Sequence, residues 1–89
     1  MLIRFSRSAS RHGIGRDKAT HVVRNCPLPL YSPEPGEEDL VIFLGLDANG
    51  MALEVMAIEL EDVFLVIHAM KLRAKYRNAF KQVMGPQER

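Results

Sequence analysis

The chain has 89 residues, of which 47% are apolar and 26% are charged, and a formal net charge of +1. This length predicts one small domain with a modest core, and the composition excludes an intrinsically disordered chain. The single cysteine excludes an internal disulfide framework and is typical of a reducing compartment. The longest apolar run, residues 40–46, is far shorter than the roughly 20 residues of a membrane helix. Because arginines also interrupt the N-terminus where a signal peptide would be apolar, we expect a cytoplasmic protein without a membrane partner.

The small net charge hides three segments of opposite sign. Residues 1–24 carry six basic side chains and one acidic one, residues 25–62 carry nine acidic and no basic ones, and residues 63–89 again carry six basic and one acidic. If the two basic ends meet in the fold, they form one positive surface that attracts phosphate backbones or an acidic protein. In the alternative interpretation, these charges solvate helix faces and pair between segments without forming a site.

Two helices are predicted within residues 1–26. Ser6 can cap a short first helix, and Gly13 can end it with a left-handed turn. A second helix begins after Gly15. Its predicted core-facing stripe consists of Ala19, Val22, Val23 and Cys26. Cys26 is therefore interpreted as a core side chain rather than as a nucleophile.

The middle of the chain predicts a loop and then a sheet. Residues 27–38 contain four prolines and predict a stiff extended loop. Residues 39–71 predict a three-stranded antiparallel meander, because apolar runs rich in β-branched side chains alternate with tight turns. Asn49-Gly50 indicates the first turn, and Glu61-Asp62 indicates the second.

The last predicted strand runs directly into a basic amphipathic helix. From residue 72 the apolar period changes from two to about 3.6, so residues 72–84 predict a helix, and residues 85–89 form a polar tail. The expected fold is a single α+β domain spanning residues 1–89. It contains two N-terminal helices, the three-stranded antiparallel meander and a C-terminal helix.

The basic cluster where the last strand ends is the strongest candidate site. It consists of His68, Lys71, Arg73, Lys75, Tyr76 and Arg77, with Arg11 and His12 as expected neighbours in space. An imidazole titrates near neutral pH and can act as a general acid or base. Guanidinium and ammonium groups can hold a phosphate. The cluster is sufficient for metal-free RNA cleavage but is not diagnostic of it.

His68 also has a structural interpretation, because a histidine on an apolar strand face is often a satisfied core residue. Strand alternation places Lys71 on the opposite face. The residues expected on the face of His68 are Phe64, Val66 and Met70.

Neither a metal site nor a carboxylate pair is expected. Three histidines without a cysteine pair or carboxylates at ligand spacing predict no metal, and nothing predicts a cofactor. Glu54 and Glu59, in the middle strand, are expected to face solvent rather than to form an acid–base pair.

Several short motifs resemble the BrnT-type toxins of the RelE-like superfamily. Arg11-His12-Gly13-Ile14 before a helix resembles their Lys/Arg-His-Gly-Ile motif, and Leu53-Glu54-Val55 after a glycine hairpin resembles their central strands. Residues 66–71 are similar to their closing strand, which typically reads Ile-Ile-Ser-Ala-Arg-Lys. A basic helix with a late aromatic, Tyr76 or Phe80, follows in both. The first half of the chain resembles the DUF4258 family about as well.

This resemblance implies a ribonuclease toxin that inhibits translation and is neutralised by a cognate antitoxin, usually a DNA-binding protein. Lys71 matches the lysine of the family's closing strand. Three positions depart from the family pattern: His68 replaces a serine, Met70 replaces an arginine, and Tyr76 stands where glutamate is frequent. Either His68 and Arg73 take over the phosphate chemistry, or this chain cleaves poorly or not at all.

The leading interpretation is a toxin-like, metal-independent endoribonuclease of a type II toxin–antitoxin pair, acting on RNA that is free or associated with the ribosome. The candidate catalytic residues are His68, Lys71 and Arg73. The candidate RNA-binding residues are Arg11, His12, Lys75 and Arg77. The alternative is a non-catalytic interaction module whose basic surface holds an acidic protein or RNA. An uncovered edge of the meander would also allow a homodimer or a partner strand.

Overall fold

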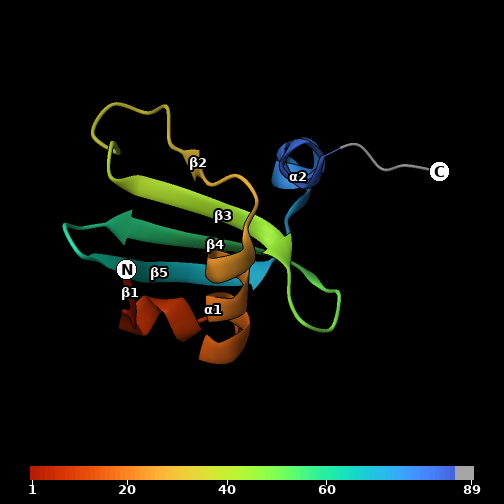
Figure 1. Cartoon of the computed structure of the whole chain (residues 1–89), viewed down its shortest axis with the longest axis horizontal. Helices are drawn as coiled ribbons and strands as arrows, with labels where there is room; N and C mark the ends of the chain where they lie inside the picture. The colour runs from red at the N-terminus through yellow and green to blue at the C-terminus, as the bar shows by residue number, and fades with distance from the viewer. Residues whose placement is uncertain (86–89) are drawn as a thin grey trace.

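The computed structural model describes residues 1–85, which form a five-stranded mixed sheet with helices packed against it (Figure 1). The strands are β1 (Leu2–Phe5), β2 (Leu30–Tyr31), β3 (Leu40–Leu46), β4 (Ala52–Glu59) and β5 (Val63–Lys71). The helices are the 3-10 helices η1 (Arg7–Ser10) and η2 (Ala74–Tyr76) and the α-helices α1 (Arg16–Asn25) and α2 (Arg77–Met84). The strand order is β1-β5-β4-β3-β2, and β1 runs parallel to β5. The expected arrangement of two N-terminal helices, a three-stranded meander and a C-terminal helix is therefore wrong.

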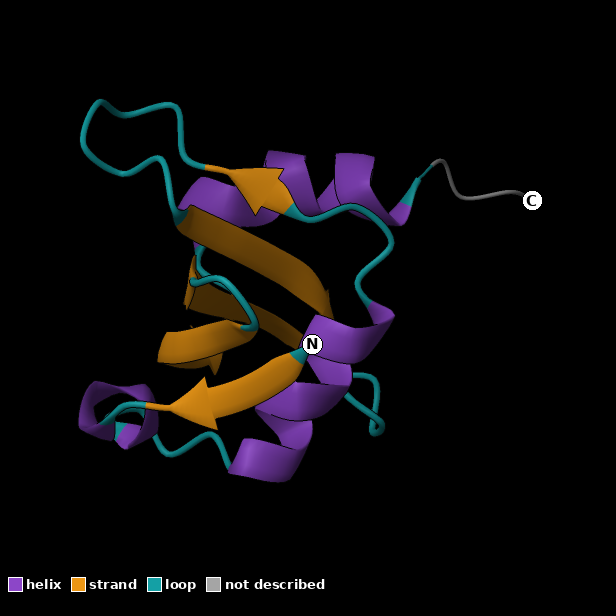
Figure 2. Cartoon of the chain, turned by 60° about the vertical axis from the view of Figure 1, so that its left-hand side comes forward, coloured by secondary structure: helices purple, strands orange, loops and turns teal. Residues whose placement is uncertain are grey.

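The N-terminus forms a strand, and only η1 remains of the predicted first helix. β1 pairs with the first half of β5, and the two views agree that it lies at the edge of the sheet (Figure 2). Ser6 does not cap η1 with its side chain. Its backbone N–H instead donates to the carbonyl of Val66 at 2.9 Å. Ser8 Oγ then donates to the carbonyl of Ile67 at 2.8 Å. The β5 edge of the expected meander is thus occupied first by β1 and then by η1.

Two other boundaries also differ from the prediction. The proline-rich segment 27–38 contains the short strand β2, which pairs with β3 at the other edge of the sheet, where prolines are tolerated. The predicted helix over residues 72–84 begins later, because residue 73 is still extended and η2 precedes α2. Residues 86–89 of the predicted tail lie outside the described residues.

The main core lies between α1 and one face of the sheet. The predicted stripe of α1 is confirmed: Ala19, Val22 and Val23 are buried, and Cys26 packs beside them. They meet apolar side chains of β3, β4 and β5, namely Val41, Phe43, Leu53, Val55, Ala57, Val66 and Ala69. Residues at even positions of β3 point the other way, and there Leu46 lines a hollow together with Phe80 and Met84 of α2. No helix among residues 1–85 combines the length and apolar character of a membrane span.

A β-bulge in β5 decides which face of the sheet carries His68. The register pairs His68 with Met56 but Val66 with Ala57, so Ile67 is an extra residue. Val66 consequently belongs to the core under α1, whereas His68 faces the opposite side of the sheet. The predicted alternation, which placed both residues on one face, is wrong because the bulge shifts the parity of the strand.

Candidate active site

The centre of the candidate site is Glu54, which lies in β4 and is 0% exposed. Arg73, two residues after β5, binds its carboxylate three times. The backbone N–H of Arg73 donates to Oε1 at 2.9 Å, Nε donates to Oε2 at 2.8 Å, and Nη2 also donates to Oε2. Nε2 of His68 lies 3.0 Å from the same Oε2. The expectation that Glu54 faces solvent is therefore wrong.

These contacts keep the buried carboxylate ionised. Burial alone would raise the pKa of Glu54, but hydrogen bonds from the side chain and backbone of Arg73 and from His68 outweigh it, so the pKa lies below its usual value. The same contact raises the pKa of Arg73, because the carboxylate accepts from its guanidinium. Glu54 is thus a fixed negative charge beside the imidazole of His68 and the guanidinium of Arg73.

The lowered pKa of Glu54 predicts a loss of stability in acid. The unfolded chain takes up the proton first, so the contribution of Glu54 to the free energy of unfolding is complete above the ordinary pKa of 4.5 and is lost as the pH falls below it. We expect urea unfolding curves between about pH 3 and pH 7 to show this fall. The fall should be shallower in Glu54→Gln, which lacks the titrating group. The same pH dependence in both proteins would contradict the assignment.

His68 is held in one orientation by this carboxylate. Because an ionised carboxylate only accepts hydrogen bonds, Nε2 of His68 carries the hydrogen and donates it to Glu54. Nδ1 is then left to exchange a proton with another group. The His68 side chain is 21% exposed, so the ring reaches the surface. The ring of His12, from the loop after η1, meets it edge-on with the centroids 5.5 Å apart.

Some of the other predicted site residues join this pair, and others do not. Arg73 lies over the ring of Tyr76 with its guanidinium carbon 5.6 Å from the centroid, and Lys75 Nζ lies 5.2 Å from the same centroid. Burial raises the pKa of the Tyr76 phenol. Lys71, by contrast, pairs with Leu53, whose side chain lies in the core under α1. Lys71 is therefore on the opposite face of the sheet from His68.

The remaining predicted residues lie at the surface. Arg11 is exposed and directly precedes His12, and Arg77 is exposed at the start of α2. Among residues 1–85, no group of three or more His, Cys, Asp or Glu side chains could hold a metal ion. The site consists of two imidazoles, the guanidinium of Arg73, the ammonium of Lys75, the phenol of Tyr76 and one buried carboxylate.

Glu54 is the site residue that sequence reasoning missed. One signal was available: Glu54 stands between Leu53 and Val55 in a segment, residues 25–62, that contains no basic side chain. A carboxylate in the middle of an apolar strand needs a cation or a hydrogen-bond donor if it is buried. A cationic partner therefore had to come from the first or the last segment of the chain.

No family model, no curated protein and no solved structure matches the chain. The resemblance to the BrnT-type toxins accordingly stays a prediction from short motifs.

Proposed function

We propose that this protein is a metal-independent endoribonuclease that acts as the toxin of a type II toxin–antitoxin pair. The observation that supports it best is the pair of imidazoles, His12 and His68, with His68 fixed by the buried carboxylate of Glu54. RNA cleavage without a metal needs one group that accepts a proton and another that donates one, and imidazoles do both near neutral pH.

In the proposed reaction, one imidazole takes the proton of a ribose 2′-hydroxyl. The O2′ oxygen attacks the adjacent phosphorus, the bond from phosphorus to O5′ breaks, and the second imidazole gives its proton to O5′. The products are a 2′,3′-cyclic phosphate and a 5′-hydroxyl. Arg73 can stabilise the developing charge with the N–H groups that Glu54 does not occupy, since its side chain is 39% exposed. Arg11 can do the same from its place beside His12.

The toxin role adds a biological consequence to this chemistry. Cleavage of RNA, free or on the ribosome, would inhibit translation, and a cognate antitoxin would block it. The support for this part of the proposal is the set of motifs similar to BrnT-type toxins. No role is proposed for Lys71 at the imidazole pair, because it lies across the sheet from His68.

The decisive experiment is an RNA cleavage assay in EDTA with the purified protein, with and without ribosomes. We expect cleavage that chelation does not abolish and that leaves 2′,3′-cyclic phosphate ends. Absence of cleavage in both settings would overturn the proposal.

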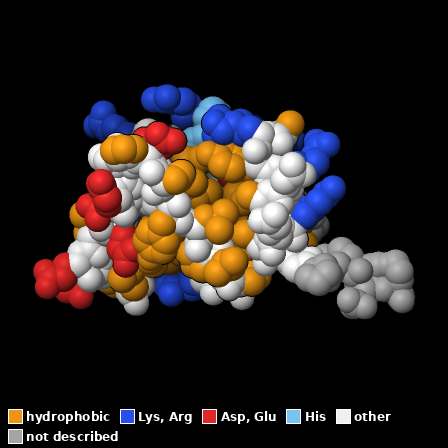
Figure 3. Space-filling model, turned by 90° about the horizontal axis from the view of Figure 1, so that it is seen from above, with side chains coloured by type: hydrophobic (Ala, Val, Ile, Leu, Met, Phe, Trp, Pro, Cys, Tyr) orange, Lys and Arg blue, Asp and Glu red, His pale blue; other side chains and the backbone are white. Residues whose placement is uncertain are grey.

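A second candidate, the non-catalytic interaction module, is favoured by one observation. On the sheet face that carries His68, a hollow of about 280 Å³ is lined by Leu40, Ile58 and Ile67 and bordered by Glu37 and Asp39. Figure 3 shows a group of hydrophobic side chains in the middle of one face. Acidic side chains lie to the left of this group, Lys, Arg and His side chains lie above it, and Lys and Arg side chains lie to its right. Such patches are typical of protein interaction sites. A protein that binds a partner but cleaves no RNA would support this second function.

A further inference from the structure

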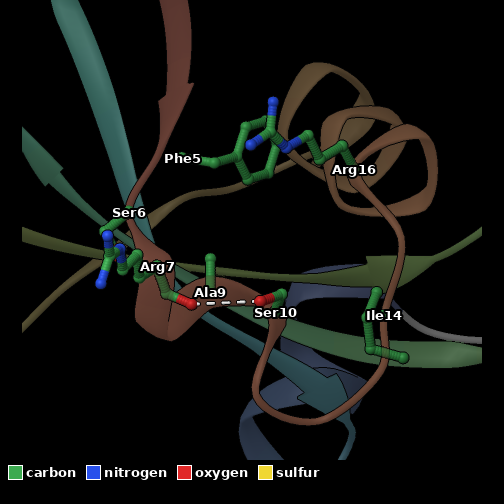
Figure 4. A pocket seen from close by; sticks show the side chains of 7 residues that line it. All are labelled: Phe5, Ser6, Arg7, Ala9, Ser10, Ile14 and Arg16. Atoms are coloured by element: carbon green, nitrogen blue, oxygen red, sulfur yellow. Dashed lines mark hydrogen bonds between the residues drawn. The ribbon is translucent and has the colours of Figure 1, made fainter.

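A basic groove runs along β1 and η1. A hollow of about 450 Å³ lies between β1, η1 and the start of α1, and its lining includes Phe5, Arg7, Ser10 and Arg16 (Figure 4). A second hollow of about 390 Å³ adjoins it and shares Phe5 and Arg16, with Arg4 at its rim. Together they form one groove, which contains none of the residues that make up the imidazole site.

The three arginines of this groove are available for an anion. Within the described part of the chain, the ion pairs all belong to Glu54, so Arg4, Arg7 and Arg16 make none. All three are exposed. The lining of the two hollows contains no acidic side chain. Arg16 lies over Phe5 inside the groove, whereas Arg4 alternates with Phe5 along β1 and lies at the rim, and the Arg7 side chain extends beside Ser6 (Figure 4). Unpaired guanidinium groups in and around one groove favour a ligand with several negative charges.

The groove also has a surface on which a flat ring can stack. The guanidinium carbon of Arg16 lies over the ring of Phe5, 5.4 Å from its centroid (Figure 4). Nucleic-acid bases stack on aromatic rings and on guanidinium planes alike. An acidic peptide has charges but few flat rings, so this combination favours a nucleic acid over an acidic protein.

The larger hollow lies close to His12 along the chain. His12 follows Ser10, which lines the larger hollow, by only two residues, and two residues of chain span at most about 7 Å. We propose that the groove binds single-stranded RNA, with a base stacked at Phe5 and Arg16 and phosphates on Arg4 and Arg7. It would place the neighbouring phosphate at His12 and His68. This inference rests on the proposed ribonuclease function and adds the strandedness of the substrate and the surface that holds it.

The test measures binding separately from cleavage. A fluorescent single-stranded RNA whose 2′-hydroxyls are methylated cannot be cleaved, and its affinity is measured by fluorescence anisotropy at several salt concentrations. We expect Arg16→Ala to weaken binding about tenfold or more, because it removes both a stacking surface and a charge. Arg7→Ala should weaken binding and reduce the salt dependence by about one phosphate contact. Arg24→Ala, an exposed arginine at the other end of α1, is the matched control and should bind normally.

Several outcomes would overturn the inference. Wild-type affinity in both Arg16→Ala and Arg7→Ala would do so, as would equal affinity for an RNA duplex of the same length. Binding of a poly-glutamate peptide, but not of the RNA, would assign the groove to an acidic protein. If unmodified RNA is cleaved but its binding does not depend on Arg16, the ribonuclease function would stand and the groove would not be the RNA-binding surface. Specific binding of RNA without any cleavage would support the role of the groove and overturn the ribonuclease function.

Discussion

We expect Glu54→Gln to lower the free energy of unfolding by about 3 kcal/mol, at the lower end of the range for breaking a buried ion pair. Glutamine has nearly the same shape, but it carries no charge and presents an N–H₂ group where His68 and Arg73 require an acceptor. The guanidinium of Arg73 would lose its counter-charge. The loss stays at the lower end of the range because the Arg73 side chain is 39% exposed and can be hydrated again.

Urea unfolding at neutral pH measures this loss, and Glu59→Gln in the same strand is the matched control. Glu59 accepts a hydrogen bond from Tyr31, whose side chain is exposed, so its replacement should cost little. Equal stability of the two variants would mean that the carboxylate of Glu54 is not the buried centre described here. A double variant, Glu54→Leu with Arg73→Met, should recover part of the stability, because it removes both charges together.

The second large effect concerns the imidazole pair. If the proposed reaction is right, His12→Ala and His68→Ala should each reduce RNA cleavage by about 100-fold to 10,000-fold, the usual contribution of a general acid or base. The double variant should lose little more than either single one, because the two groups act in one step. The rate of the wild-type enzyme should rise and fall with pH, and each single variant should lose one side of that profile.

His21→Ala is the control for these variants. His21 lies in α1, where its backbone carbonyl accepts from Asn25 at 2.8 Å, and it takes no part in the site. It should cleave normally. If His12→Ala also cleaves normally, and His68→Ala is only less stable, then His68 supports the structure around Glu54 without acting on RNA.

The parts of the fold that were predictable are those with local signals. The turn at Asn49-Gly50 has the positive φ that favours glycine, and β3 and β4 pair antiparallel across it. β1 has no such signal, because it is four residues long and its partner, β5, lies at the other end of the chain. The bulge at Ile67 also has no signal in the sequence, because Ile67 is an ordinary strand residue.

The candidate site was predictable only in part for the same reason. The basic residues after β5 form a visible cluster, so His68 and Arg73 were found. In the sequence, Glu54 looks like an ordinary strand residue, because its partner Arg73 is 19 positions away and meets it only in the folded chain. His12 and His68 meet only because β1 lies beside β5 and thereby brings η1 to the same end of the sheet. Contacts of this kind depend on the whole topology.

The parallel pairing of β1 with β5 also sets the order in which the protein assembles during synthesis. Leu2 leaves the ribosome 61 residues before its partner Val63, and closing so large a loop is slow compared with forming a hairpin. The hairpins of β3, β4 and β5 can form before β1 is placed. Until Arg73 follows, Glu54 has no cation to accompany its burial. A nascent chain would therefore be unable to bring His12 to His68 before β5 has been made, so any activity of that pair would begin only after that part of its own message has been translated.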